Sequence, residues 1–387
     1  MTVGASTSNT YQEYFGKEHQ LFRKALREFV KKEITPNVTE WEEAGEYPRK
    51  LYEKMADLGY LGVGIPENLG GAGGDVFTAI VFNEEMVRCG STGLVSSIAS
   101  FGIALPPIVI HGTPTQHEKF VKPVLAGKRM SALGITEPSG GSDVANLKTT
   151  AVRDGDHYVV NGSKTFITTG VRAEQLTCAV RTGGEGAHGI SFLVIEKDTP
   201  GYKVGRALKK MGWWASDTAE IYFDNCRVPV ENRIGEENKG FYIIMENFQM
   251  ERLMLCVMAN TTAQLALEES IKYAKSREVF GKRLNGFQVT RHKLVDMATL
   301  VEASREFTYR VAAKMNAGVD QLKEVSMAKN FACQVSDKAT YDAVQIFGGY
   351  GFMRETLVER LYRDNRILSI GGGTTEIMKE IISGYVI

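Results

Sequence analysis

Hydrophobic residues recur at helical spacing along the first third of the chain. Within residues 12–61, apolar side chains such as Phe22 and Leu26 stand three or four positions apart, the period of an amphipathic helix. The pattern breaks over 62–74, where six residues are glycine, and this composition predicts a loop. Helical periodicity resumes over 77–125, so the sequence predicts a helical N-terminal region.

Near Ser131 the pattern changes from helical to strand-like. Residues 149–234 are rich in β-branched side chains and turn signals, which is typical of a β domain. The Asp-Gly pair at 154–155 is a hairpin signature, and the Asn-Gly pair at 161–162 predicts a second turn. We expect strands at the apolar runs SFLVIE and AEIYF.

From Glu236 to its end the chain is again helical in pattern. Because strands and helices occur in separate blocks, the sequence argues against an alternating βαβ sheet. We therefore predict an α+β multidomain chain. It has a helical N-terminal domain (1–130), a central β domain (131–236) and a helical C-terminal domain (237–387).

Composition and charge exclude several classes of protein. Of the 387 residues, 43% are hydrophobic and 24% are charged, so the chain is not mainly disordered. The 46 basic residues balance 46 acidic ones, which argues against a dedicated nucleic-acid or anionic-membrane binder. The uncharged run 89–110 is long enough to resemble a membrane span. Its serines, glycines and Pro-Pro pair instead favour a buried helix with an exit turn.

The cysteines and the first residues bear on the compartment. Five cysteines, far apart and without a C-x-x-C pair, predict buried thiols in a reducing compartment and neither a disulfide nor a metal site. The first ten residues carry no positive charge, unlike a secretory or Arg-rich transit segment. We expect a cytoplasmic protein in a bacterium, or a mitochondrial-matrix protein if the chain is a processed eukaryotic one. The cysteines are Cys89, Cys178, Cys226, Cys256 and Cys333.

Two glycine-containing motifs do not support the common nucleotide sites. The G-x-G-x-x-G pattern at 184–189 precedes a strand, whereas a dinucleotide fingerprint opens a helix, so we interpret it as a hairpin loop. The GSKT run at 162–165 lacks the Walker A spacing.

Two polar, glycine-rich segments are better candidates. Residues 133–143 combine three hydroxyl side chains with a Gly-Gly pair, which lets a backbone approach a ligand, although composition alone favours an interdomain turn. Residues 370–376 carry three glycines before two threonines. Their amides could hold an anion or a polar cofactor, or the segment is a linker before a terminal helix.

Glu251 lies in the apolar stripe of a predicted amphipathic helix. Phe248 and Leu255 are in phase with it, and no cation stands three or four residues away, so no intrahelical ion pair is available. A carboxylate among apolar side chains should have a raised pKa, which suits a general base. The alternatives are a Glu paired with a distant Arg or Lys, and a Glu at the edge of the stripe.

Taken together, these segments resemble the acyl-CoA dehydrogenase family over essentially the whole chain, from about Tyr14 to Tyr385. Five stretches carry the resemblance, in order and at family-like spacing. They are GITEPSGGSDV (134–144), NGSKTFITTG (161–170), SREVFGKRLNGFQ (276–288), QIFGGYGF (345–352) and YRDNRILSIGGGTTEI (362–377).

The resemblance implies a fold and a reaction. The central domain would be β-barrel-like and the C-terminal domain a four-helix bundle, in a homotetramer that binds FAD. A Glu would remove the α-proton of an acyl-CoA thioester while the β-hydride goes to flavin N5, giving the trans-2-enoyl-CoA of fatty-acid β-oxidation. An electron-transferring flavoprotein would be the usual electron acceptor.

The resemblance also assigns binding residues by position. The implied FAD contacts are Leu133, Ile135, Thr136, Ser142, Phe166, Ile167, Thr168, Arg277, Phe287, Gln288, Gln345, Ile346, Gly348, Gly349, Thr374 and Glu376. Those from Arg277 to Gly349 would hold the FAD of a neighbouring subunit, and Phe166 replaces the commoner Trp beside the flavin. The implied substrate contacts are Ser142, Gln249, Arg252, Gly372 and Gly373.

The last loop departs from the family pattern. Most members carry the catalytic Glu just before a Gly-Thr pair, where this chain has Gly372. The isovaleryl and long-chain branches place it instead on a helix before an E/Q-R-L motif, and this chain reads Met250-Glu251-Arg252-Leu253 there. Helical phase and resemblance therefore agree on Glu251 as the base. By position, the resemblance also implies the Gly372 N–H as a donor to the thioester carbonyl.

Two alternatives keep the fold and change the function. One is an acyl-CoA oxidase that uses O2, and the other is a non-catalytic acyl-CoA-binding or assembly protein. The C-terminal run GGGTTEIMKEII resembles the long-chain and terpenoid-type branches. This favours a long or methyl-branched acyl group and leaves chain length and pathway open.

Overall fold

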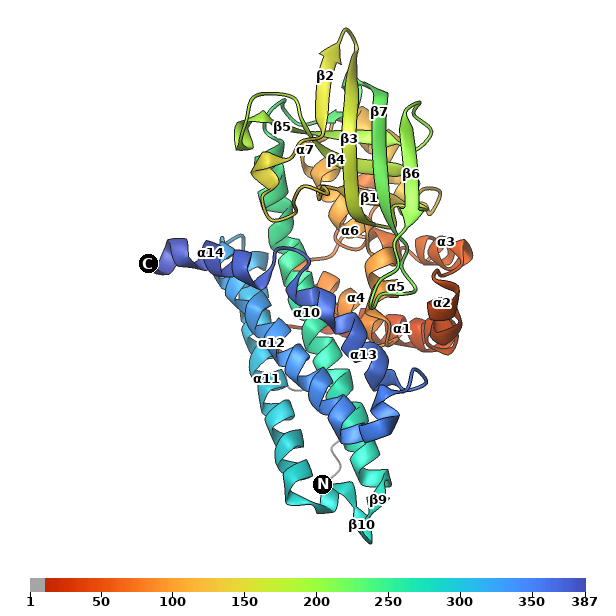
Figure 1. Cartoon of the computed structure of the whole chain (residues 1–387), viewed down its shortest axis with the longest axis vertical. Coiled ribbons are helices and arrows are strands. Elements are labelled where there is room, and N and C mark those ends of the chain that lie inside the picture. The colour runs from red at the N-terminus through yellow and green to blue at the C-terminus, as the bar shows by residue number, and fades with distance from the viewer. Residues whose placement is uncertain (1–10) are drawn as a thin grey trace. The chain divides into compact units, whose positions relative to one another are not determined.

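Figure 1 shows a computed structural model of the chain, which describes residues 11–387. The described residues pack as two compact units. The helical unit comprises 11–39, Gly74–Thr92 and Arg252–Ile387, and the sheet unit comprises Glu40–Gly73 and Gly93–Glu251. Along the chain, helices precede and follow the strands, which confirms the predicted order of elements.

Proline shapes the helical part of the sheet unit. Three of its helices carry a proline in their first turn, where the missing N–H costs nothing but the preceding helix must end. The region predicted to be helical is therefore a series of short helices. The α-helices among residues 11–387 are α1 (Lys17–Phe29), α2 (Val38–Ala44), α3 (Arg49–Asp57), α4 (Val76–Val87), α5 (Thr92–Ile98), α6 (Phe101–Ala104), α7 (Pro106–His111), α8 (Pro114–Gln116), α9 (Lys122–Leu125), α10 (Gly240–Ser276), α11 (Gln288–Asn316), α12 (Leu322–Phe347), α13 (Leu357–Asn365) and α14 (Thr375–Val386).

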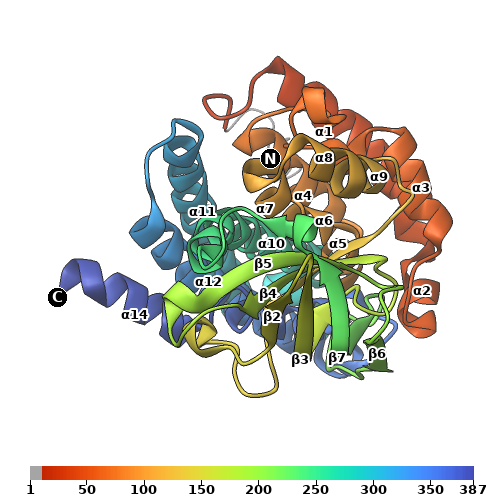
Figure 2. The ribbon, with the colours of Figure 1, turned by 90° about the horizontal axis from the view of Figure 1, so that it is seen from above.

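The sheet unit is built on an eight-stranded, mostly antiparallel sheet. Seven strands follow the order β6-β7-β3-β2-β4-β5-β8, and the eighth, β1, lies off this path and pairs with β4. Figure 2 shows the strands from β5 to β6 following one another across it. Both β1 and β2 pair with β4 in parallel. The strands are β1 (Ser131–Gly134), β2 (Thr150–Asp154), β3 (His157–Thr168), β4 (Gln175–Arg181), β5 (Ile190–Glu196), β6 (Tyr202–Ala207), β7 (Thr218–Pro229) and β8 (Arg233–Ile234), with β9 (Glu278–Val279) and β10 (Lys282–Arg283) forming a separate hairpin in the helical unit.

Three turn predictions can be compared with the sheet. The Asp-Gly pair at 154–155 does join β2 to β3, and the glycines at 184–189 lie in the loop between antiparallel β4 and β5. The second predicted turn is wrong, because the Asn-Gly pair at 161–162 lies inside β3. The register with β7 shifts there, and Gly162 has a φ of 145°, so the pair forms an irregularity in a continuous strand.

One face of the sheet buries the core of this unit. Tyr158, Leu176, Ile195 and Ile221 are all fully buried there, each contributing about 1.5–3 kcal/mol relative to exposure. All five cysteines of the chain are free and buried, as predicted. Within residues 11–387, no single helix is long and apolar enough to cross a membrane. The segments Thr92–Ile98 and Phe101–His111 satisfy length and composition only as a pair bent by 48°.

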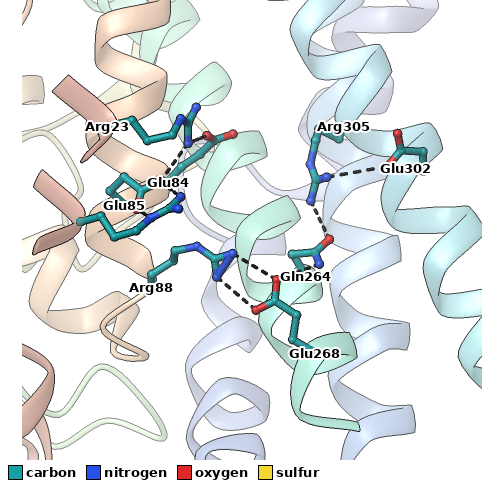
Figure 3. Close-up of polar contacts among 9 residues, drawn as sticks. Arg23, Glu84, Glu85, Arg88, Gln264, Glu268, Glu302 and Arg305 are labelled. Carbon is teal, nitrogen blue, oxygen red and sulfur yellow. Dashed lines mark hydrogen bonds and ion pairs between the residues drawn. The ribbon is translucent and has the colours of Figure 1, made fainter. Parts of the chain in front are cut away.

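The helical unit contains the long helices α11 and α12, which run side by side (Figure 1). Figure 3 shows ion pairs between elements of this unit, including Arg23 with Glu85 and Arg88 with Glu268. Arg27 also pairs with Glu85, and these five residues are here termed the charged cluster. Glu85 of α4 is 1% exposed and accepts hydrogen bonds from Arg23 and Arg27 of α1 at 2.7–2.9 Å. Arg88 donates two bonds of 3.1 Å to Glu268 of α10. Buried carboxylates require such partners, so the cluster ties these helices together.

Candidate functional site

The loop that follows β1 is fixed to the neighbouring strand β3 by a buried ion pair. Lys164 of β3 donates from Nζ to the Glu137 carboxylate at 2.8 Å, and their side chains are 0% and 4% exposed. The same Nζ donates to the Ile135 carbonyl at 3.2 Å. One residue further along β3, the Thr165 N–H donates to the Thr136 carbonyl at 2.9 Å. Three adjacent loop residues are thus held by two strand residues.

Glu137 is also held from its other side. Its carboxylate accepts the backbone N–H groups of Lys148 at 2.6 Å and Thr149 at 2.9 Å. Burial alone would raise the pKa of Glu137, but the attraction of Lys164 and these hydrogen bonds outweigh it and lower the pKa to about 2. The carboxylate therefore stays ionised and acts as a fixed anchor for the loop.

The structure brings the flavin contacts expected in the sheet unit into two adjoining segments. Leu133, Ile135, Thr136 and Ser142 lie in or beside the anchored loop, where Ile135 is buried and Ser142 exposed. The segment Phe166–Thr168 ends β3 directly after the anchoring residues. Phe166 has a φ of 59° and its side chain is 68% exposed. An exposed aromatic ring on a strained backbone offers an apolar surface to a planar ligand.

Glu251 lies within α10, as the apolar pattern predicts. It is half-buried, and its Oε2 atom is shielded from solvent. Gln249 of the same helix is also half-buried. Nearby, Asn247 donates from Nδ2 to the Ile103 carbonyl at 2.9 Å and fixes this part of α10 within the sheet unit. The raised pKa expected for Glu251 stays a prediction.

In the helical unit, side chains from α10 and α12 bind the backbone of the glycine loop, residues 371–373. Arg252, buried on α10, donates from Nε to the Gly372 carbonyl at 3.4 Å. Lys329 of α12 donates from Nζ to the Gly371 carbonyl at 2.7 Å and also to the Gly373 carbonyl. All three carbonyls of the loop therefore accept hydrogen bonds from basic side chains.

The residues after the glycine loop begin α14. Thr374 is the N-cap, and its hydroxyl accepts the Ile377 N–H at 3.2 Å, so its side chain caps this helix. Asn330 of α12 donates to the Thr375 carbonyl at 3.2 Å. Glu376 is exposed in the first turn of α14.

A separate hollow of about 510 Å³ in the helical unit gathers several of the contacts assigned to a neighbouring subunit's FAD. Arg277, Ile346, Gly348 and Gly349 line it. A Cβ atom added to either glycine would meet no heavy atom within 4 Å, so a ligand can reach the backbone there. Exposed Gln345 adjoins the lining, and Phe287 and exposed Gln288 form the start of α11.

These surfaces fit the parts of FAD. The exposed ring of Phe166 suits the flat isoalloxazine, and the Arg277 guanidinium suits a phosphate, which arginine binds through several N–H donors. Sequence analysis did not single out Glu137, Lys164 or Lys329. For Lys329 a signal was available, a basic residue in an apolar stripe. Val325 and Ala332, both buried, flank Lys329 at helical spacing.

Comparisons with known proteins identify the family of the chain. The chain matches the acyl-CoA dehydrogenase N-terminal domain over 16–128, the middle domain over 132–226 and the C-terminal domain over 238–386. It is 39% identical over 376 residues to the caffeyl-CoA reductase-Etf complex subunit CarC of Acetobacterium woodii, covering 97% of this chain and 99% of that one. It is 38% identical over 381 residues to the long-chain specific mitochondrial acyl-CoA dehydrogenase of Mus musculus, covering 96% and 87%.

Solved structures show the same fold. A probable acyl-CoA dehydrogenase from Mycobacterium abscessus superposes with a TM-score of 0.95 at 50% identity, covering 96% of this chain and 100% of that one. A glutaryl-CoA dehydrogenase from Mycobacterium smegmatis in complex with FADH2 gives 0.92 at 25% identity, covering 97% and 96%. The chain therefore belongs to the acyl-CoA dehydrogenase family and is an FAD-dependent oxidoreductase of the type that dehydrogenates acyl-CoA.

Proposed function

We propose that this chain oxidises the α,β bond of an acyl-CoA thioester to the trans-2-enoyl-CoA, with Glu251 as the base that removes the α-proton. The observation that supports this assignment best is the place of Glu251 on α10. Its carboxylate has an oxygen shielded from solvent, and it directly precedes Arg252, which binds the glycine loop. The position where most family members carry the base is occupied by Gly372, which has no side chain.

The chain's own residues supply proton transfer, orientation and exclusion of water. The Glu251 carboxylate takes the α-proton and becomes a carboxylic acid, while the electron pair of the C–H bond moves toward the thioester carbonyl. The Gly372 N–H donates to that carbonyl oxygen and stabilises the developing negative charge. FAD, when bound, supplies the oxidant that accepts the β-hydrogen with its electron pair. The anchored loop and Phe166 would hold that cofactor.

The acyl group that we propose is long-chain or methyl-branched. Support comes from the position of the base, which resembles that of the isovaleryl and long-chain branches, and from the similarity to the mouse long-chain enzyme. The Acetobacterium woodii relative, equally similar, is named for caffeyl-CoA. An aromatic acyl-CoA therefore belongs in any substrate test.

We also propose an electron-transferring flavoprotein as electron acceptor and a homotetramer as the assembly. The name of the Acetobacterium woodii relative includes an Etf complex, which supports the first proposal. Large apolar side chains exposed in the helical unit support the second, because such surfaces mark interfaces: Phe280 is 95% exposed, Phe352 84% and Val289 72%. Light scattering should give about four times the chain mass of 42.7 kDa.

An anaerobic titration tests the function. Purified protein is titrated with isovaleryl-, octanoyl-, palmitoyl-, citronellyl- and dihydrocaffeyl-CoA while the absorbance of oxidised flavin near ~450 nm is followed. Bleaching by one ligand identifies a dehydrogenase and its substrate class together. A yellow protein that no ligand bleaches would contradict the proposal and favour a non-catalytic acyl-CoA-binding protein. Rapid peroxide formation in air without an added acceptor would favour an oxidase.

A further inference from the structure

The glycine loop is bound in an unusual way for a surface connection between two helices. Lys329 is completely buried, and lysine is almost never fully buried without partners. It uses Nζ to bind the carbonyls of Gly371 and Gly373, which flank Gly372. Gly372 and Gly373 have φ angles of 63° and 97°, a left-handed conformation that glycine adopts without strain. The loop is therefore shaped to present both carbonyls to one side chain.

The planarity of the peptide group fixes where the next amide points. The peptide between Gly371 and Gly372 is trans, since the described residues contain no cis bond. In a trans peptide the C=O and the N–H point in opposite directions. Because the Gly371 carbonyl points at Lys329, the Gly372 N–H points away from Lys329. Among residues 11–387, no group accepts a hydrogen bond from that N–H, so the N–H is available to a ligand.

The same peptide group also transmits polarisation. A hydrogen bond accepted by a carbonyl draws electron density toward the oxygen and makes the N–H of that peptide a stronger donor. Lys329 acts on the oxygen end of the group whose nitrogen end is the Gly372 N–H. Arg252 acts on the following peptide, through the Gly372 carbonyl.

We propose that Lys329 is a positioning residue for the reaction: it aims and strengthens the Gly372 N–H as the donor to the thioester carbonyl oxygen. This inference rests on the proposed function, in which an acyl-CoA thioester binds at this loop. Lys329 touches neither the substrate nor the reacting atoms. A merely structural lysine would affect folding alone, whereas a positioning lysine affects the recognition of one carbonyl group.

The test compares two ligands that differ only at that carbonyl. One is an acyl-CoA thioester, and the other is the S-alkyl-CoA thioether of equal length, in which a methylene replaces the C=O. Binding to protein with its flavin reduced under anaerobic conditions is measured by calorimetry, so that the thioester is not consumed. We expect the wild-type protein to prefer the thioester. Lys329→Met should reduce that preference by about fivefold to tenfold, the worth of one hydrogen bond, while thioether affinity changes less than about twofold.

Matched variants separate positioning from folding. Lys338→Met makes the same change on the same helix, at an exposed lysine paired with Asp342, and should leave the preference intact. Lys329→Gln keeps a shorter neutral donor and should give an intermediate preference, and it serves if Lys329→Met does not fold. Unchanged discrimination in a folded Lys329→Met protein overturns the inference. A wild-type protein that binds both ligands equally also overturns it, whereas one that binds neither refutes the proposed function itself.

Discussion

Replacing Lys164 by Met removes the buried partner of Glu137 while keeping the length of an unbranched side chain. The Glu137 carboxylate would then be buried among backbone donors with no compensating charge. The magnitude follows from the pKa of Glu137, which falls from 4.5 to about 2 in the folded protein. At about 1.4 kcal/mol per pH unit, this corresponds to roughly 3 kcal/mol in favour of the folded state at neutral pH. Breaking a buried pair typically costs about 3–5 kcal/mol, so both arguments give the same size.

The sign of the pH dependence provides a second, independent signature. Because the folded pKa of Glu137 is lowered, its contribution is complete above pH 4.5 and is lost as the pH falls toward about 2. Without Lys164, only the hydrogen bonds from Thr149 and Lys148 oppose the effect of burial, so the pKa of Glu137 lies higher than in the wild type. The variant should therefore lose less stability than the wild type between pH 5 and 3, in addition to being less stable at pH 7.

Urea unfolding followed by tryptophan fluorescence at several pH values measures the loss of stability at pH 7 and its pH dependence. The flavin content after dialysis shows whether the loop still binds the cofactor. Lys203→Met is the matched control, because Lys203 is an exposed lysine of the same sheet, 3.6 Å from Asp224. Its effect should stay below about 1 kcal/mol. If Lys164→Met unfolds at the wild-type urea concentration at pH 7 and keeps its flavin, the anchoring role assigned to the ion pair is wrong.

Three further substitutions test other parts of the structure. Glu251→Gln should retain flavin and ligand binding but abolish bleaching of the flavin by substrate. The control Glu246→Gln, at an exposed position of the same helix, should bleach normally. Bleaching of Glu251→Gln at the wild-type rate would exclude Glu251 as the base. Arg277→Ala should lower the flavin content several-fold with little change in melting temperature. The control Arg283→Ala, at an exposed residue beside Glu278, should not lower the flavin content. Equal flavin content in the two variants would exclude Arg277 from cofactor binding. Glu85→Gln should lower the free energy of unfolding at pH 7 by about 3–5 kcal/mol, measured by thermal unfolding. Burial would raise the pKa of Glu85, but Arg27 and Arg23 lower it, so the stability difference from the wild type should shrink on acidification below pH 4.5. A stability difference that does not change with pH would count against an ionised Glu85.

The sequence predicted the order of helical and strand regions because the spacing of apolar residues differs between them. It also placed Glu251 on a helix with an apolar stripe. The Asn-Gly pair at 161–162 misled, because a local turn signal cannot reveal that a long strand continues through an irregularity. The anchor between Glu137 and Lys164 was missed because partners 27 residues apart leave no periodic trace. The three-domain boundaries, the assembly and the compartment stay predictions.

The backbone angles of the glycine loop have a consequence for how such a site changes over evolutionary time. A φ of 63° at Gly372 costs a residue with a side chain about 1–2 kcal/mol. In a chain whose base lies elsewhere and whose loop has this conformation, introducing a glutamate at 372 meets an immediate penalty in stability. A base in the loop is therefore more than one substitution away, because the backbone must change with it. The two positions of the base are thus separated by a change of backbone conformation as well as by a change of side chain.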